Sequence, residues 1–97
     1  MKTKERIIKT IKELKQNLHE KYKIREIGIF GSIIREEGKD TSDIDLLVDF
    51  KEDAGLFDLI GLALFLEEKL HRRVDIVPKR ALRKEIKNSV LKEVITL

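Results

Sequence analysis

The chain has 97 residues, of which 41% are hydrophobic and 40% carry a charge. A chain of this length forms one modest hydrophobic core, so we expect a single domain over residues 1–97. Its 21 basic and 18 acidic residues leave a net charge of only +3, which does not by itself indicate a dedicated anion-binding surface. The absence of cysteine excludes disulfides, thiol catalysis and thiolate metal sites, so any metal ligands must be sought among oxygen atoms.

The N-terminal segment, residues 1–12, alternates charged and apolar side chains. It contains no apolar run of the kind that a secretory signal peptide needs. No segment of the chain approaches the roughly 20 consecutive apolar residues that cross a bilayer. We therefore expect a cytoplasmic protein without a membrane span.

The first predicted element is an amphipathic helix over residues 4–20. Apolar residues recur there at spacings of four, three and four, which places them on one helical face. These residues are Ile7, Ile11, Leu14 and Leu18. The next segment, Ile24 to Phe30, is rich in β-branched residues and predicts a strand that ends near Gly31 and Ser32.

A short helix from Ser32 to about Glu37 and a polar turn over residues 38–42 are predicted next. A second strand follows over residues 43–50, where alternate side chains point to opposite faces. One face carries Ile44, Leu46, Val48 and Phe50, and the other carries Asp43, Asp45, Leu47 and Asp49. We expect the first face to belong to the core and the second to present carboxylates.

Residues 56–70 predict a helix whose apolar side chains cover well over half of its circumference, more than a surface helix needs. Two interpretations fit this helix. Its apolar surface is buried between the sheet and the terminal helix, or Phe57, Leu64 or Phe65 contacts another chain. Another protein or a second copy of this chain would fit the second interpretation.

Residues 73–77 predict a third strand that ends at Pro78. A terminal helix follows, with apolar residues at four-residue spacing at Leu82, Ile86, Val90 and Val94. The order is thus helix, strand, short helix, strand, helix, strand, helix, which predicts an α/β (α+β) fold with a small mixed sheet flanked by helices. The short first connection favours antiparallel pairing of the first two strands, whereas the long helical connection permits a parallel third strand.

Asp43 and Asp45 are two residues apart on one strand, so their side chains project to the same side, about 7 Å apart at Cα. Carboxylates favour Mg²⁺ or Mn²⁺. A pair of such ions about 3.5–4 Å apart can orient a triphosphate, activate an attacking oxygen and neutralise a leaving group. An Asp-x-Asp pair is also common in ordinary turns and strand edges, so the pattern is not specific by itself.

Gly31 and Ser32 add a candidate phosphate-binding turn. Glycine allows close backbone approach, the N–H groups at a helix start attract anions, and the Ser32 hydroxyl can donate to a phosphate oxygen. The alternative is a plain turn in which Ser32 caps the short helix. The turn therefore gains weight only when it is combined with the carboxylates.

Asp75 lies in a strand-like run, where a buried carboxylate needs a compensating partner. Two partners are open at this point: the cations held by Asp43 and Asp45, or an ion pair with Arg72 or Arg73. Asp49 shares the face of Asp45 but lies about 13 Å further along the strand, too far to share a cation pair. Asp49 is therefore the weaker candidate.

The chain resembles a known family in these residues. Gly31-Ser32, ten intervening residues and Asp43-Ile44-Asp45-Leu46-Leu47-Val48 resemble the signature of the minimal nucleotidyltransferases, relatives of DNA polymerase β. The later run Arg73-Val74-Asp75-Ile76-Val77 is similar to the strand that supplies the third carboxylate in that family. The resemblance extends over most of the chain.

The resemblance implies an enzyme that transfers a nucleoside monophosphate, usually AMP from ATP, to an acceptor hydroxyl with release of pyrophosphate. It implies that Asp43, Asp45 and Asp75 hold two Mg²⁺ or Mn²⁺ ions and that Gly31 and Ser32 hold the phosphates. Asp75 is also expected to help activate the acceptor.

The chain departs from the family pattern after the Gly-Ser pair. The family often has Ala-Arg-Gly there, whereas this chain has Ile33-Ile34-Arg35-Glu36. Arg35 is kept in register and is expected to contact phosphate. Glu36 replaces a flexible glycine, so the competence of the loop is an open question at this point.

Minimal nucleotidyltransferases often act as antitoxins of HEPN-domain ribonuclease toxins, and some adenylylate the toxin. The resemblance therefore implies a HEPN-type toxin as partner. The alternative is a non-catalytic antitoxin, or binding module, that neutralises its partner by complex formation through the apolar helix. A third option is the same catalytic core acting on a small molecule or an RNA end.

Basic residues cluster around the third strand and the following helix. A solvated surface is the simpler interpretation, and nucleic-acid binding is not favoured because no base-stacking aromatic motif accompanies the cluster. The residues concerned are Arg72, Arg73, Lys79, Arg80, Arg83 and Lys84. His19 and His71 lack ligand spacing and are assigned no metal role.

Overall fold

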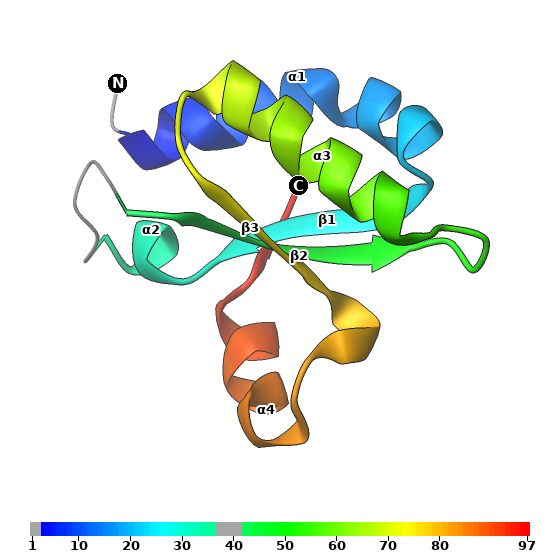
Figure 1. Ribbon diagram of the computed structural model, residues 1–97. Helices are drawn as coiled ribbons and strands as arrows, with labels where there is room; N and C mark the ends of the chain where they lie inside the picture. Colours follow the sequence, from blue (N-terminus) through cyan, green and yellow to red (C-terminus); the bar gives the residue numbers. More distant parts are fainter. Residues whose placement is uncertain (1–2, 37–41) are drawn as a thin grey trace.

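The computed structural model describes residues 3–36 and 42–97 (Figure 1). The helices are α1 (Thr3–Lys21), α2 (Ser32–Arg35), α3 (Leu56–Leu70) and α4 (Lys84–Glu93), with a short 3₁₀ turn η1 (Lys79–Ala81). The strands are β1 (Ile24–Phe30), β2 (Ile44–Phe50), β3 (Val74–Pro78) and β4 (Ile95–Thr96). The predicted strand over residues 24–30 and the predicted helix over residues 56–70 are confirmed to the residue.

The four strands form one mixed sheet in the order β3-β2-β1-β4. β1 pairs antiparallel with both β2 and β4, and β2 pairs parallel with β3. The predicted antiparallel and parallel pairings of the first three strands are therefore confirmed. The long connection through α3 is what allows β3 to return in the same direction as β2.

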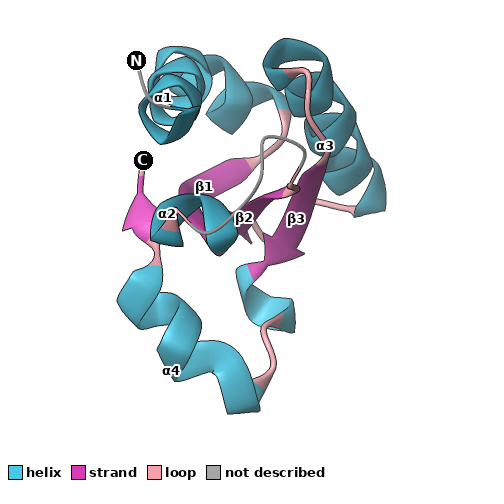
Figure 2. Ribbon diagram, turned by 90° about the vertical axis from the view of Figure 1, so that its left-hand side faces the viewer, coloured by secondary structure: helices cyan, strands magenta, loops and turns pink. Residues whose placement is uncertain are grey.

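Helices α1 and α3 lie over one face of the sheet, and α4 lies on the other side (Figures 1 and 2). The core fills the space between the sheet and helices α1 and α3. The apolar stripe predicted for α1 is confirmed, since Ile7, Ile11 and Leu18 are buried and Leu14 packs against the core. By contrast, α4 buries only Val90 among its own residues.

The alternation predicted for β2 is confirmed. Ile44, Leu46 and Val48 are fully buried in the core, and Phe50 is nearly so. On β1, the pairing with β2 shifts register between Ile24 and Glu26, which marks a bulge. Strict alternation of side chains counted back from Ile27 would point residue 25 into the core. The bulge inserts one extra residue into β1, so Ile24 points into the core instead.

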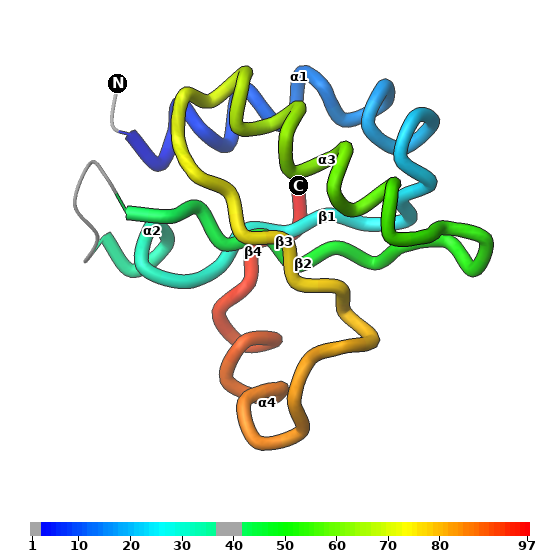
Figure 3. Tube along the Cα trace, viewed as in Figure 1, coloured from blue at the N-terminus to red at the C-terminus, as the bar shows by residue number. Residues whose placement is uncertain are grey.

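The end of the chain differs from the prediction. The predicted order contains neither η1 nor β4, and the terminal helix is shorter than expected, because Leu82 and Val94 lie just outside α4. Strand β4 has only two residues, too short for a pattern in sequence to reveal it. Figure 3 follows the chain from α4 into β4, where Leu97 is buried and its N–H donates to the Ile27 carbonyl at 2.9 Å.

Two further predictions concern the segment after β1. The short helix α2 ends at Arg35, one turn long. The predicted continuation is wrong at Glu36, which has a left-handed conformation and ends the helix. Glu37 and residues 38–41 of the predicted polar turn lie outside the described residues. Among the described residues, no helix is both long enough and apolar enough to cross a membrane.

Candidate active site

The candidate site lies where the end of β1 meets the beginnings of β2 and β3. Asp45, the second residue of β2, is the register partner of Asp75 on β3 and of Phe30 at the end of β1. Strands that pair directly lie about 4.8 Å apart, so Asp45 and Asp75 are cross-strand neighbours. Asp43 comes directly before β2, and the sheet therefore places the three predicted carboxylates along one edge.

Gly31 faces the Asp45 carboxylate from the neighbouring strand end. It has a positive φ of 82°, and a Cβ atom at this position would meet Asp45 Oδ2 at 2.2 Å. No side chain fits in that space, so glycine is required both by the backbone conformation and by the close approach of Asp45. Ser32 follows as the first residue of α2 and is partly exposed.

Electrostatic repulsion is concentrated at Asp45. Burial raises the pKa of the Asp45 carboxyl, and the nearby charges of Asp75, Asp43 and Glu93 raise it further, while Arg35 lowers it. Asp45 is half-buried, whereas Asp43 and Asp75 are exposed. The most enclosed carboxylate of the site is thus held beside three others at an energetic cost that a bound cation would relieve.

The donor set fits a hard divalent cation by its chemistry. All three candidate ligands are carboxylates, which Mg²⁺ and Mn²⁺ prefer, and their mutual repulsion favours a positive charge between them. Within residues 3–36 and 42–97, however, no group of three acidic, histidine or cysteine side chains is spaced to hold a metal ion. Asp43, Asp45 and Asp75 would therefore have to turn towards one another to share one.

Arg35 and Gly31 are both held by Glu93, a residue that the sequence did not single out. The Gly31 N–H donates to Glu93 Oε2 at 2.9 Å, and Arg35 Nη1 lies 2.6 Å from Glu93 Oε1. Burial raises the pKa of the Glu93 carboxyl, but the Gly31 N–H and Arg35 outweigh it, so the net pKa is lowered. The last turn of α4 is thereby tied to the predicted phosphate turn.

The position of Glu93 follows from β4. The β1–β4 ladder pairs Gly28 with Thr96 and Ile29 with Ile95, and continuing this antiparallel register by two residues brings Glu93 opposite Gly31. Figure 2 shows α2 beside the segment that leads out of α4. No local pattern in the sequence indicates this contact, because Glu93 lies 62 positions from Gly31 and is brought there by the two-residue strand β4.

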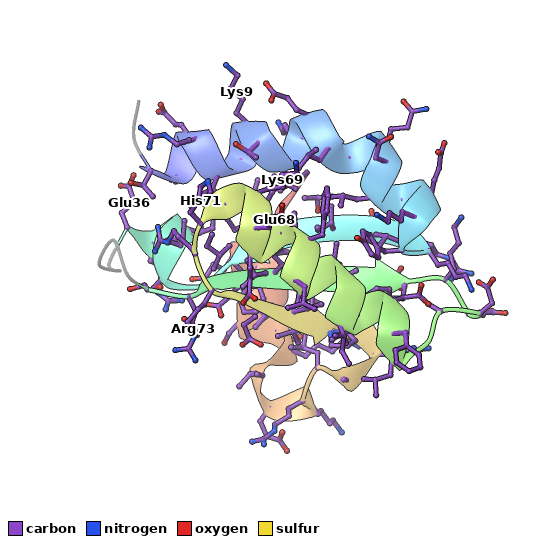
Figure 4. The ribbon with its side chains drawn as sticks, turned by 45° about the horizontal axis from the view of Figure 1, so that its top comes forward. Lys9, Glu36, Glu68, Lys69, His71 and Arg73 are labelled. Carbon is purple, nitrogen blue, oxygen red and sulfur yellow. The ribbon has the colours of Figure 1, made fainter. Side chains whose placement is uncertain are left out.

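Glu36 replaces the glycine that the family pattern has, and its backbone explains why glycine is common there. Glu36 closes α2 in a left-handed conformation with φ 58°, a region that glycine enters without strain. Figure 4 shows its side chain at the exposed end of α2. Glu36 thus keeps the turn that the family builds with glycine.

The alternative partners of Asp75 are directed elsewhere. Arg72 donates to the Ser42 carbonyl, and Figure 4 shows Arg73 pointing away from the body of the molecule. No ion pair joins Asp75 to either arginine within the described part of the chain. Asp49 is paired across the sheet with Glu26 and lines a small cavity of about 60 Å³ under α4, away from Asp75.

The fold and this edge of carboxylates define a small nucleotidyltransferase. Residues 11–97 match the family model described as "Nucleotidyltransferase domain", so the chain belongs to the nucleotidyltransferase family. It is 44% identical over 95 residues to the protein adenylyltransferase MntA of Thermococcus cleftensis, covering 98% of this chain and 96% of that protein. These findings confirm the resemblance on which the sequence prediction depended.

Solved structures agree with this assignment. A candidate minimal nucleotidyltransferase superposes with a TM-score of 0.80 at 38% identity and covers 93% of this chain and 92% of its own. A toxin–antitoxin crystal structure with AMP-PNP superposes with a TM-score of 0.70 at 23% identity, covering 87% of this chain and 69% of that chain. The second similarity is one of fold alone.

Proposed function

We propose that this chain transfers AMP from ATP to a hydroxyl group of a HEPN-type toxin and thereby acts as its antitoxin. The observation that carries this proposal is the grouping of Asp45 with its register partner Asp75, next to Gly31. The relative from Thermococcus cleftensis is named a protein adenylyltransferase, and one structural neighbour belongs to a toxin–antitoxin complex. Together they favour a protein acceptor.

The proposed reaction is a displacement at the α-phosphorus of ATP. The acceptor oxygen forms a bond to this phosphorus while the bond to the bridging oxygen of the β-phosphate breaks, and pyrophosphate leaves with the electron pair. The hydroxyl proton passes to a carboxylate, for which Asp75 is suited because it is exposed at the edge of the site. Gly31, Ser32 and Arg35 are assigned to the phosphates.

Asp43, Asp45 and Asp75 would hold the divalent cations, Mg²⁺ or Mn²⁺, with two ions as the expected number. When bound, the cations would neutralise charge on the triphosphate and on departing pyrophosphate. Cation binding has a readout that is independent of transfer. Because a cation relieves the repulsion at Asp45, Mg²⁺ should raise the melting temperature of the wild type and leave that of Asp45→Asn almost unchanged.

The activity test is label transfer from α-labelled ATP with Mg²⁺ to a purified HEPN-type protein. Asp45→Asn should reduce the rate about 10²–10³-fold, the size of effect expected when one electrostatic group of a transfer site is removed. The matched control is Asp49→Asn, on the same strand and the same face, which should transfer at the wild-type rate. Wild-type protein without transfer, or equal losses in both variants, would reject the proposed role.

A second candidate function, neutralisation by complex formation, has one observation in its favour. The outer surface of α3 exposes Leu56, Phe57 and Leu64 by 69%, 89% and 62%, and Ile60 continues the same stripe. The interpretation that α3 is entirely buried is therefore wrong, although Leu62 and Leu66 do enter the core. Phe65, the third predicted contact residue, packs instead against Tyr22 at 6.0 Å between ring centroids.

Phe57→Ser tests whether this stripe binds the toxin. If it does, the variant loses complex formation in size-exclusion chromatography, while Ile86→Ser, an apolar residue 48% exposed on α4, does not. Toxin inhibition that survives in Asp45→Asn and disappears in Phe57→Ser would favour neutralisation without chemistry. Inhibition that depends on Asp45 would favour the enzyme.

A further inference from the structure

The helix α2 cannot hold its own conformation. It is a single turn of four residues, no side chain caps its start, and residues with positive φ flank it at Gly31 and Glu36. An isolated helix this short is unstable in water, because nucleation costs more than one turn returns. Tertiary contacts must therefore fix the segment that carries Ser32 and Arg35.

One carboxylate supplies such contacts at both ends of α2. Glu93 accepts the Gly31 N–H through Oε2, just before the helix, and holds Arg35 through Oε1 in its last turn. The distances are 2.9 and 2.6 Å, as short as charge-assisted hydrogen bonds or slightly shorter. The Glu93 side chain is only 19% exposed, so water competes weakly for these bonds.

The Glu93 carboxylate is itself well fixed. The residue after it, Val94, donates its N–H to the Val90 carbonyl, and Ile95 then pairs with Ile29. Leu97 completes the anchor by entering the core. The C-terminal segment is therefore fixed against β1, and through Glu93 it holds the turn that follows β1 in place.

We propose that Glu93 is a positioning residue of the nucleotide site, which bridges Gly31 and Arg35 and so sets the shape of the phosphate-binding turn. This inference rests on the proposed function, since it assigns nucleotide phosphates to that turn. Glu93 acts through the two residues that it holds and does not contact the nucleotide. Its removal therefore weakens nucleotide binding more than it slows transfer.

The test compares Glu93→Gln with wild-type full-length chain by calorimetric titration with AMP-PNP and Mg²⁺. Loss of the charge should raise the Kd about tenfold, because a charge-assisted bond is replaced by a neutral one. In transfer assays the KM for ATP should rise by a similar factor with kcat changed less than threefold. The matched control is Glu85→Gln, which removes the same charge from an exposed position in the first turn of α4 and should leave Kd unchanged.

Two further measurements separate positioning from general loss of structure. The amide proton of Gly31 should move upfield in Glu93→Gln, while that of Gly55, which donates to Asp58 at 2.8 Å, should stay in place. Glu93→Asp keeps the charge on a shorter side chain that reaches only one partner, so its Kd should lie between those of wild type and Glu93→Gln. These variants should melt cooperatively and keep the helical circular dichroism of the wild type.

The outcomes distinguish this inference from the proposed function. Wild-type chain that binds no AMP-PNP would reject both. Wild-type binding with an unchanged Kd in Glu93→Gln would reject the positioning role alone. A lower Kd in Glu93→Gln would also reject it, because Glu93 would then be an internal anion that competes with the phosphates.

Discussion

The two faces of β2 carry different kinds of side chain. Towards α1 and α3 it presents Ile44, Leu46 and Val48, all fully buried in the core. Towards α4 it presents Asp45 and Asp49, both only partly buried, with a small cavity between the sheet and the helix. One face gains stability from burial, whereas the other places the Asp45 carboxylate beside Asp75 of the neighbouring strand.

This difference shows that the candidate active site lowers the stability of the fold, whereas the core face raises it. Apolar burial contributes about 25 cal/mol per Å², so the fully buried side chains of the core face stabilise the fold. On the site face, burial and the neighbouring carboxylates raise the pKa of Asp45, which means that its ionised form is destabilised. Truncation of an apolar residue on the core face should therefore lower stability, whereas neutralising Asp45 on the site face should raise it.

The largest effect on stability is expected from Leu46→Ala. Leu46 is fully buried between the sheet and the helices, and such truncations cost about 2–5 kcal/mol because they leave a cavity. Urea unfolding measures the change. The matched control is Leu47→Ala on the site face, where the side chain already borders a cavity and the loss should be smaller. Equal losses would contradict the proposed difference between the faces.

The core face was predictable from the sequence because alternation in β2 and the four-three-four spacing in α1 are local patterns. The placement of the carboxylates was predictable from local patterns too, since Asp43 and Asp45 flank Ile44 at the start of β2 and Asp75 lies in β3. Glu93 and β4 were not predictable. Their positions depend on a two-residue ladder between the chain end and β1, which no periodicity records.

Gly31→Ala should have the next largest effect. The substitution forces a residue with a Cβ into a φ of 82° and places that atom 2.2 Å from Asp45 Oδ2. Left-handed strain of this kind costs about 1–3 kcal/mol, and the displaced carboxylate should also abolish transfer. Gly55→Ala is the control, since nothing lies within 4 Å of its Cβ position and its φ of −124° is ordinary. Unfolding midpoints in urea should separate the two variants.

Asp45→Asn should stabilise the fold while it removes activity. The folded-state pKa of Asp45 is raised, so the folded protein binds this proton more tightly than the unfolded chain does. Above the pKa of Asp45 in the folded protein, the ionised carboxylate lowers the free energy of unfolding. As the pH falls below that pKa, Asp45 becomes protonated and the destabilisation disappears. The melting temperature of the variant should exceed that of the wild type most near neutral pH, and the difference should shrink in acid.

Asp75→Asn checks the cause of that gain. It removes one of the charges that raise the pKa of Asp45, but Asp75 itself is exposed. Its gain in melting temperature should have the same sign and be smaller. A loss of stability in both variants would mean that the carboxylates make favourable contacts that outweigh their repulsion.

The smallest effect is expected at the other end of α2, from Glu36→Gly. A non-glycine residue in the left-handed region costs about 1–2 kcal/mol, and glycine loses about 0.5–1 kcal/mol of backbone entropy, so the net gain should be about 1 kcal/mol or less. His71→Gly is the control, because His71 closes α3 with a similar φ of 54° and is not part of the phosphate turn. Both variants should gain similar stability in urea unfolding. If only Glu36→Gly also raises the KM for ATP, the left-handed glutamate does more than end a helix: it keeps the phosphate turn rigid where the family pattern has a flexible glycine.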